Sequence, residues 1–316
     1  MSGGVVFIGT GAVALPLLKE LLKRGERVDL VVTRPDRPKG RGRKTLPTPV
    51  AEEAARLALP LVTPENINDE EIVNSIKALD PDFLVLADFG QILKKPLLES
   101  ARHGAVNMHP SLLPRWRGPS PVVSPIMNGD PVTGVSVMLM DEGMDTGPVF
   151  VQERVAVPEN ITGGELTELL ASKGATLLAG SLDKIRVGKL KPVPQDEGLA
   201  TVSAMIGPEI TQMDWNLSPV AAARRINALS PKPGVKAFLG GRMVKLLAAS
   251  PLDEPGEPGV ILRSSPGGLT VGAGTGAIRI ERVHPEGRNP MDAASFANGW
   301  QVRRGMRFEN GTVDGH

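Results

Sequence analysis

The stretch from Val106 to Gly147 reads VNMHPSLLPRWRGPSPVVSPIMNGDPVTGVSVMLMDEGMDTG. Asn107 and His109 lie two residues apart at the end of an apolar run, so on an extended backbone their side chains point to the same side. In open α/β sheets, the carboxyl end of a buried strand presents side chains to a crevice. Asp145 comes later, in a Gly- and Asp-rich turn after a second apolar run. We therefore expect one pocket to collect an amide, an imidazole and a carboxylate.

These three residue types also have ordinary structural uses. A His after an apolar run is usually a hydrogen-bonded structural residue, an Asn there forms turns, and an Asp between Met and Thr caps a loop. Together, however, the three groups can carry out acyl transfer to an amine, because donors stabilise charge on a carbonyl oxygen and a carboxylate orients an imidazole. We favour this catalytic interpretation of Asn107, His109 and Asp145.

Length and composition limit the possible functions. The chain has 316 residues and 41% hydrophobic content, enough for about two domains. Its net charge is +1, so affinity for a polyanion must come from local clusters of basic residues. The absence of cysteine excludes disulfides, thiol nucleophiles and Cys-ligated metals, and the four histidines lack metal-ligand spacing. No long apolar run or cleavable leader is present, so we expect a soluble, untargeted, cytoplasmic protein.

The first half of the chain alternates between strand-like and helix-like segments. An apolar run at residues 4–9 precedes leucines at helical spacing in residues 11–24, and the alternation continues to a long amphipathic helix at residues 162–187. This order predicts a mostly parallel, doubly wound, Rossmann-like α/β sheet with helices on both faces. Thr162 and Glu165 predict a capping box at the start of the long helix.

The turn GTGAVA, residues 9–14, matches the dinucleotide-binding fingerprint with alanine at its third position. It supports an alternative hypothesis, a nucleotide-dependent oxidoreductase. Any tight turn from a strand to a helix needs the same glycines, however, and Arg34 replaces the acid that the fingerprint expects after the second strand. We therefore favour a structural role for this turn.

Residues 34–50, RPDRPKGRGRKTLPTPV, form an unusually basic segment. Six basic residues accompany one acid, and the glycines and prolines predict an irregular loop. A charge run of this kind is normally a solvated surface. A loop at the carboxyl end of the second strand overhangs the crevice, however, and Arg and Lys are suited to phosphate contacts.

A proline- and charge-rich stretch, residues 189–204, predicts a linker between two domains at residues 1–188 and 205–316. Beyond the linker, five short apolar runs separated by glycine turns predict a small β-barrel of the oligonucleotide-binding (OB-like) type. We expect a helix at residues 219–229 and no regular structure at residues 201–215.

In the order and spacing of several motifs, the chain resembles the N10-formyltetrahydrofolate-dependent formyltransferases. The motifs are Asn-x-His at 107–109, SLLP at 111–114, the Asp-x-Gly turn at 145–147 and the closing run HPEGRNPMDAASF. The resemblance covers nearly the whole chain and implies formyl transfer from 10-formyltetrahydrofolate without a metal. The basic segment resembles the loop by which some members grip methionyl-initiator tRNA, whose formylation serves translation initiation.

The resemblance implies a role for each matching residue. Asn107 donates to the charge that develops on the formyl oxygen, His109 stabilises that charge, and Asp145 orients the imidazole and helps to deprotonate the attacking amine. The implied folate-binding residues are Ser111, Leu112, Leu113, Pro114, Phe89, Gly90 and Gln91. The implied tRNA-binding residues are Arg37, Lys39, Arg41, Arg43 and Lys44.

Three other functions share parts of this pattern. A formyltransferase for a nucleotide-linked small amine would share the first domain, but would need neither the basic segment nor the barrel. A 10-formyltetrahydrofolate hydrolase would use water at the same three residues. A non-catalytic RNA-binding protein is disfavoured because Asn107, His109 and Asp145 are all present. We expect a monomer whose partners are methionyl-initiator tRNA and the folate, with no membrane partner.

Overall fold

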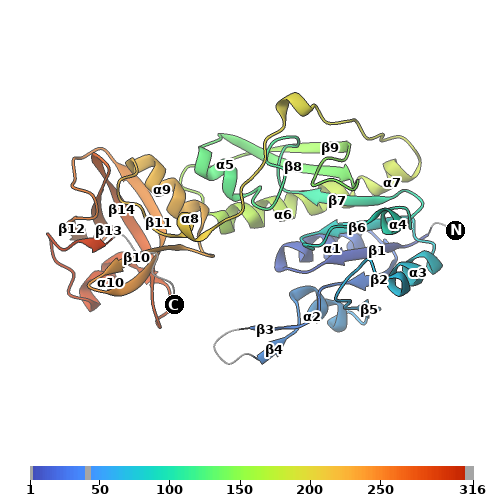
Figure 1. Ribbon diagram of the computed structural model, residues 1–316, viewed down its shortest axis with the longest axis horizontal. Coiled ribbons are helices and arrows are strands. Elements are labelled where there is room, and N and C mark those ends of the chain that lie inside the picture. The colour runs from blue at the N-terminus through green and yellow to red at the C-terminus, as the bar shows by residue number, and fades with distance from the viewer. Residues whose placement is uncertain (1–2, 40–43, 310–316) are drawn as a thin grey trace. The chain divides into compact units, whose positions relative to one another are not determined.

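The computed structural model describes residues 3–39 and 44–309 (Figure 1). The chain divides into two compact units. The first comprises Met1–Pro121, Thr133–Val155 and Thr167–Ser203, and the second comprises Val122–Val132, Ala156–Leu166 and Ala204–His316. Each unit is described by itself below.

The first unit is built on a seven-stranded sheet with the strand order β5-β2-β1-β6-β7-β8-β9 (Figure 1). Five neighbouring strands, from β5 to β7, run parallel, and β8 joins β7 antiparallel. The predicted Rossmann-like, mostly parallel fold is thereby confirmed. The strands are β1 (Val5–Gly9), β2 (Val28–Val32), β5 (Leu61–Val62), β6 (Phe83–Ala87), β7 (Ala105–His109), β8 (Val132–Leu139) and β9 (Val149–Ala156).

The central strands are buried along their whole length. Every residue of β1 and β6 is buried, which is why both read as continuous apolar runs without alternation. Leu17, Leu18 and Leu21 give α1 its buried face. The helices that follow the strands of this part of the chain are α1 (Leu15–Lys23), preceded by the 3-10 turn η1 (Ala12–Ala14), α2 (Pro49–Arg56), α3 (Glu70–Ala78) and α4 (Lys95–Leu98).

Two segments differ from the sequence prediction. The basic segment, expected to be irregular, contains β3 (Arg37–Lys39) and β4 (Lys44–Leu46), which pair antiparallel as a separate two-stranded sheet. Pro38 is tolerated there because the ribbon has free edges. The single helix expected at residues 162–187 is divided into α6 (Gly163–Ala179) and α7 (Leu182–Arg186). Gly180 is a weak helix former, and the Ser181 hydroxyl donates to the Leu177 carbonyl (2.6 Å) at the break.

The capping box at the start of α6 is confirmed. The Thr162 backbone amide donates to the Glu165 carboxylate (2.8 Å), and the Glu165 amide donates back to the Thr162 hydroxyl (3.2 Å). These reciprocal bonds satisfy two amides that the first helical turn leaves unpaired. They also lower the pKa of the Glu165 carboxyl, with the Thr162 hydroxyl as the main cause.

The second unit is an antiparallel sheet with the order β12-β13-β14-β11-β10-β16, and β15 pairs with β14. Register shifts along β11 mark bulges, which curve a sheet, and the sheet curls as the OB-like prediction requires. The prediction of no regular structure at residues 201–215 was wrong, because Pro208 begins a one-turn helix, α8 (Pro208–Thr211). The strands are β10 (Val235–Leu239), β11 (Arg242–Leu252), β12 (Ile261–Ser265), β13 (Gly268–Ala273), β14 (Gly276–Pro285), β15 (Met291–Asp292) and β16 (Phe308–Glu309).

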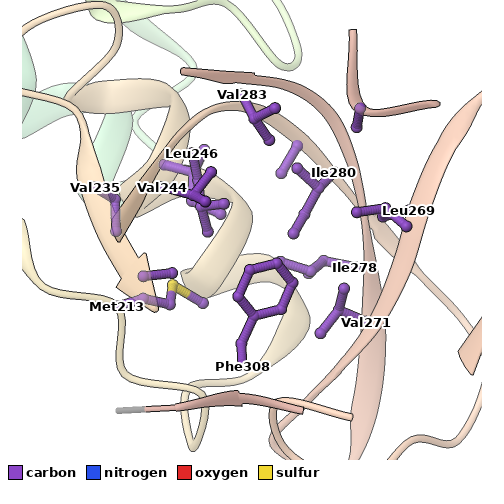
Figure 2. Close-up of a cluster of buried hydrophobic side chains, with 14 of the residues drawn as sticks. Met213, Val235, Val244, Leu246, Leu269, Val271, Ile278, Ile280, Val283 and Phe308 are labelled. Atoms are coloured by element: carbon purple, nitrogen blue, oxygen red, sulfur yellow. The ribbon is translucent and has the colours of Figure 1, made fainter. Parts of the chain in front are cut away.

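Alternate residues of the curled sheet supply its core. Figure 2 shows Val235, Leu246, Ile280 and Phe308 converging from β10, β11, β14 and β16. Trp215, nearly fully buried, stacks on Phe308 with ring centroids 5.2 Å apart. Besides α8, this unit contains the helices α5 (Val123–Asn128), α9 (Pro219–Ala228) and α10 (Ala293–Gly299).

Asn227 is the buried polar link between α9 and the sheet. Its side-chain amide donates to the Ala249 carbonyl and accepts from the Ala249 amide, both at 2.9 Å. A register shift in the β11 and β14 pairing falls between Ala248 and Ala249, so the side chain satisfies backbone groups beside a bulge.

None of the described helices combines the length and apolar character needed to cross a membrane.

We predict that Asn227→Ala lowers the free energy of unfolding by about 2 to 5 kcal/mol, because two buried backbone groups lose their partners. Chemical unfolding of the full chain measures this loss. Asn216→Ala is the control: Asn216 is exposed and bonds locally to Asp214, so the expected change is below about 0.5 kcal/mol. Equal effects of the two substitutions would contradict a structural role for the buried bridge.

Candidate active site

Strand β7 delivers the first two candidate residues. Asn107 pairs in register with Leu86 on one side and Met138 on the other, and His109 pairs with Ser136. Being two residues apart on one strand, Asn107 and His109 face the same side of the sheet. His109 is buried and Asn107 is partly exposed.

Asp145 lies against His109. Its backbone is left-handed, with φ +58°. One carboxylate oxygen, Oδ2, accepts a hydrogen bond from the Gly118 amide (2.8 Å), and the other, Oδ1, lies 3.5 Å from His109 Nδ1. The structure thus brings together an imidazole and a carboxylate that are far apart in sequence.

Both ring nitrogens of His109 face acceptors. Nε2 lies 3.1 Å from the Trp116 carbonyl oxygen, which can only accept, so Nε2 carries a hydrogen. Nδ1 faces the Asp145 carboxylate. Each ring nitrogen of His109 therefore has an oxygen beside it that can accept a hydrogen bond, which fixes the orientation of the ring.

The Asn107 side chain has no hydrogen-bond partner among residues 3–39 and 44–309. Its amide is partly exposed, next to His109 on the same face of the strand. An amide in this position is free to donate to the oxygen of a bound substrate.

The SLLP turn is held rigidly next to the strand end. Ser111 is fully buried and donates to the Arg115 carbonyl (2.6 Å), while its own carbonyl accepts from Ser136 (2.6 Å). The Leu113 amide also donates to Ser136 (3.0 Å). Leu112 and Pro114 are partly exposed, so they are the members of the predicted folate turn with surface to offer a ligand.

The second predicted folate-binding segment, residues 89–91, contains two residues with structural contacts and one exposed glycine. Phe89 is buried and packs into the core around β1 and β6. The Gln91 side chain bonds to the Ile67 amide and the Glu65 carbonyl, both at 3.0 Å, so it holds a neighbouring loop. Gly90 is exposed with φ +76°, and a side chain there would approach Arg34.

Of the predicted tRNA-binding residues, Arg37 is exposed and lies 3.4 Å from Glu65. Lys39 and Lys44 pair across β3 and β4. Arg41 and Arg43 lie outside the described residues. Their proposed contacts therefore rest on the sequence.

The turn at residues 9–14 does not favour a dinucleotide. A Cβ placed on Gly11 would lie 2.1 Å from the Asp88 carboxylate, which accepts a hydrogen bond from the Gly11 amide. A negative group thus covers the backbone on which a pyrophosphate would have to sit. This contact argues against the oxidoreductase alternative.

Arg117, three residues after the SLLP turn, is a buried charged residue. Hydrogen bonds to Glu197 raise the pKa of its guanidinium, and the same pair lowers the pKa of the Glu197 carboxyl. Sequence reasoning missed Arg117 and its partner Gln195, because neither stands in a recognisable motif.

Two further features bear on the chemistry. In the described ranges, no group of three or more His, Asp or Glu side chains is placed to hold a metal ion. A cavity of about 590 Å³ lies in the second unit, and none of the predicted site residues lines it. The candidate site lies in the first unit, around His109 and Asp145.

The chain matches two family models, one described as formyl transferase over residues 4–182 and one described as the C-terminal domain of formyl transferase over residues 205–301. The chain belongs to the formyl transferase family. It is 38% identical to the methionyl-tRNA formyltransferase of Geobacter sulfurreducens over 98% of each chain. It is 39% identical to that of Geotalea uraniireducens, over 95% of this chain and 96% of the relative. The resemblance inferred from the motifs is confirmed.

Solved structures of low identity share the fold. HypX from Aquifex aeolicus in complex with tetrahydrofolic acid matches with a TM-score of 0.66 at 18% identity, over 96% of this chain and 48% of that one. An N-formyltransferase from Helicobacter canadensis in complex with folinic acid and dTDP-3-aminofucose matches with a TM-score of 0.64 at 18% identity, over 89% of this chain and 99% of that one. At this identity the likeness concerns the fold alone.

We predict that Asp145→Asn lowers the turnover of formyl transfer by about a hundredfold to ten-thousandfold. An asparagine keeps an oxygen for the Gly118 amide and tolerates the left-handed backbone, but it removes the charge opposite His109. Steady-state kinetics measure the loss, and Glu142→Gln, an exposed neighbour in the same turn, should leave turnover within about twofold. Near-normal turnover in Asp145→Asn would remove Asp145 from the mechanism.

Proposed function

We propose that this protein transfers the formyl group of 10-formyltetrahydrofolate to the free amino group of methionyl-initiator tRNA. One observation carries the proposal: His109 and Asp145 meet at 3.5 Å beside the Asn107 amide, in a chain that aligns end to end with methionyl-tRNA formyltransferases. The folate serves as co-substrate and donates the formyl group that is bonded to its N10.

The reaction begins when the neutral amino group attacks the formyl carbon. A C–N bond forms, and the carbonyl electron pair moves to the formyl oxygen. The Asn107 amide donates to that oxygen as its charge grows, and the neighbouring His109 imidazole helps to stabilise the same charge. Collapse of the tetrahedral intermediate breaks the bond to N10, and the formyl group remains on the methionyl nitrogen.

The reaction also requires that a proton move from one nitrogen to the other. The attacking nitrogen gains positive charge and must lose a proton, whereas N10 must gain one as it leaves. Asp145 faces His109 and is the nearby carboxylate that helps to carry this proton while it holds the imidazole in place. The products are the N-formylated aminoacyl-tRNA and tetrahydrofolate.

We assign folate binding and catalysis to residues 1–188 and tRNA binding to residues 205–316 and the basic segment. The exposed surfaces of Leu112 and Pro114 offer an apolar wall for the folate next to the strand end. Arg37, Lys39, Arg41, Arg43 and Lys44 supply positive charge for the tRNA phosphates.

One assay separates this function from the alternatives. The protein is incubated with 10-formyltetrahydrofolate and charged initiator tRNA, free methionine, a nucleotide-linked amino sugar or water alone. Formylation of the charged tRNA at a rate far above the other three reactions is the expected result. Preferred formylation of the amino sugar, or release of formate alone, would replace the proposal with the small-amine transferase or the hydrolase.

We predict that Asn107→Ala lowers turnover by about a hundredfold to a thousandfold, the usual loss for one donor to a developing oxyanion. The KM for 10-formyltetrahydrofolate should change by less than about threefold, because the contact forms mainly in the transition state. Asn74→Ala, on the exposed face of α3, is the matched control and should behave as wild type. Weakened folate binding at normal turnover would show that Asn107 has a binding role instead.

We predict that Arg41→Ala weakens the binding of methionyl-initiator tRNA and reduces the slope of log affinity against log salt by about one. Arg41 lies between two glycines, so the chain can approach an acceptor stem closely and present a forked guanidinium. Binding is measured from about 50 to 200 mM salt. Arg56→Ala, which removes an arginine already paired with Glu53, is the control. An unchanged affinity and slope would identify the basic segment as ordinary solvated surface.

A further inference from the structure

The segment predicted as a linker packs along the first unit. Val193 pairs through its backbone with Val149, with bonds of 2.8 and 2.9 Å. The Thr201 amide donates to the Pro114 carbonyl (3.1 Å), and the Arg117 amide donates to the Thr201 carbonyl (2.9 Å). Residues 193–203, here called the strap, therefore cross from the turn that contains Asp145 to the turn that follows the SLLP motif.

Gln195 of the strap connects two parts of the candidate active site. Its side-chain nitrogen donates to the carbonyls of Asp145 (2.8 Å) and Gly147 (2.7 Å). Its side-chain oxygen accepts from Arg117 Nε (3.0 Å) and Nη2 (2.9 Å). Because a guanidinium can only donate and carbonyls can only accept, the amide fits in one orientation and is fully used.

The buried side chain of Arg117 holds Gln195 in this arrangement. Its side chain is 7% exposed, and Glu197, also in the strap, binds its Nη1 (2.9 Å) and Nη2 (2.7 Å). A buried guanidinium needs such partners, because an unpaired charge there would be costly. Arg117 is thus fixed on both sides by one short stretch of chain.

The neighbours of Arg117 contact the two candidate catalytic residues directly. The Trp116 carbonyl lies 3.1 Å from His109 Nε2, and the Gly118 amide donates to Asp145 Oδ2 (2.8 Å). The Arg117 side chain, through Gln195, holds the Asp145 carbonyl. Hydrogen bonds therefore connect His109, through the backbone of Trp116 and the side chains of Arg117 and Gln195, to Asp145, whose Oδ1 lies 3.5 Å from His109 Nδ1.

We propose that Gln195 and Arg117 are positioning residues for formyl transfer, acting by fixing the backbone of Asp145 so that its carboxylate faces His109. This inference rests on the proposed catalytic roles of His109 and Asp145. Asp145 has a left-handed backbone, which is uncommon for a residue other than glycine and which hydrogen bonds from a neighbouring side chain can hold in place. Gln195 supplies that hold, and a displacement of about 1 Å at a catalytic group can cost about a hundredfold in rate.

The test compares Gln195→Leu and Asp196→Asn in the full chain. Gln195→Leu keeps the approximate size of the side chain and removes all of its hydrogen bonds, so kcat should fall about 10-fold to 100-fold while both KM values stay within about threefold. Asp196 is the exposed neighbour in the strap, and its side chain accepts a local hydrogen bond from the Gly198 amide (2.9 Å) that an asparagine oxygen can also accept, so Asp196→Asn should leave kcat within about twofold. Thermal unfolding of each variant verifies that it folds.

A double-mutant cycle shows whether Gln195 acts through Asp145. In the Asp145→Asn background, Gln195→Leu should lower kcat by less than about threefold, because the group that it positions is already disabled. Full additivity of the two losses, or a Gln195→Leu effect confined to KM or to stability, would overturn the inference.

A second measurement tests the positioning role independently of the proposed function. If wild type fails to formylate methionyl-tRNA, that function is wrong, and the variants are then compared by NMR. The ring-nitrogen signals of His109 at neutral pH should change in Gln195→Leu and remain as in wild type in Asp196→Asn. Unchanged His109 signals in Gln195→Leu would overturn the positioning role, whatever the substrate.

Discussion

The pairing of β7 between β6 and β8 is the constraint on which the candidate site depends. It fixes the register Leu86, Asn107 and Met138 across three strands. In a strand, a slip of one residue turns every side chain to the opposite face, so this register alone decides that Asn107 and His109 face the site. The antiparallel direction of β8 matters as well, because it places Ser136 beside His109. There the Ser136 hydroxyl makes hydrogen bonds with the backbone of the SLLP turn.

Much of the fold is readable from local sequence. Strands can be predicted where burial requires a run of apolar residues, as in β1 and β6. They can also be predicted where glycines mark the turns at either end, as in β10 and β14. The break after α6 was not predicted, since the leucine spacing continues across Gly180 and Ser181 and one glycine does not by itself end a helical pattern. The ribbon of β3 and β4 was missed because its two strands pair with each other and their sequence has no apolar pattern.

The site was predictable in part for a similar reason. Asn107 and His109 share a strand, so their spacing carries the information, and Asp145 was found through its turn and the family motif. Gln195 lies fifty positions from Asp145 in sequence, and Arg117 reads as one more charged residue beside Trp116. Long-range hydrogen bonds of this kind depend on how the strap crosses the sheet edge, and no local pattern records that path. Sequence reasoning therefore proposed the catalytic groups but did not predict the side chains that hold them in place.

The left-handed turn at Asp145 restricts how this site can vary. Among acidic residues, the short side chain of aspartate is the one that tolerates such a backbone readily, because it can form local hydrogen bonds. Glutamate would place its charge one methylene further out and would also strain the turn. Backbone conformation and chemical identity are therefore selected together at this position. A family member with glutamate here would need a differently folded turn, so the loop and the acid can be expected to change only in concert.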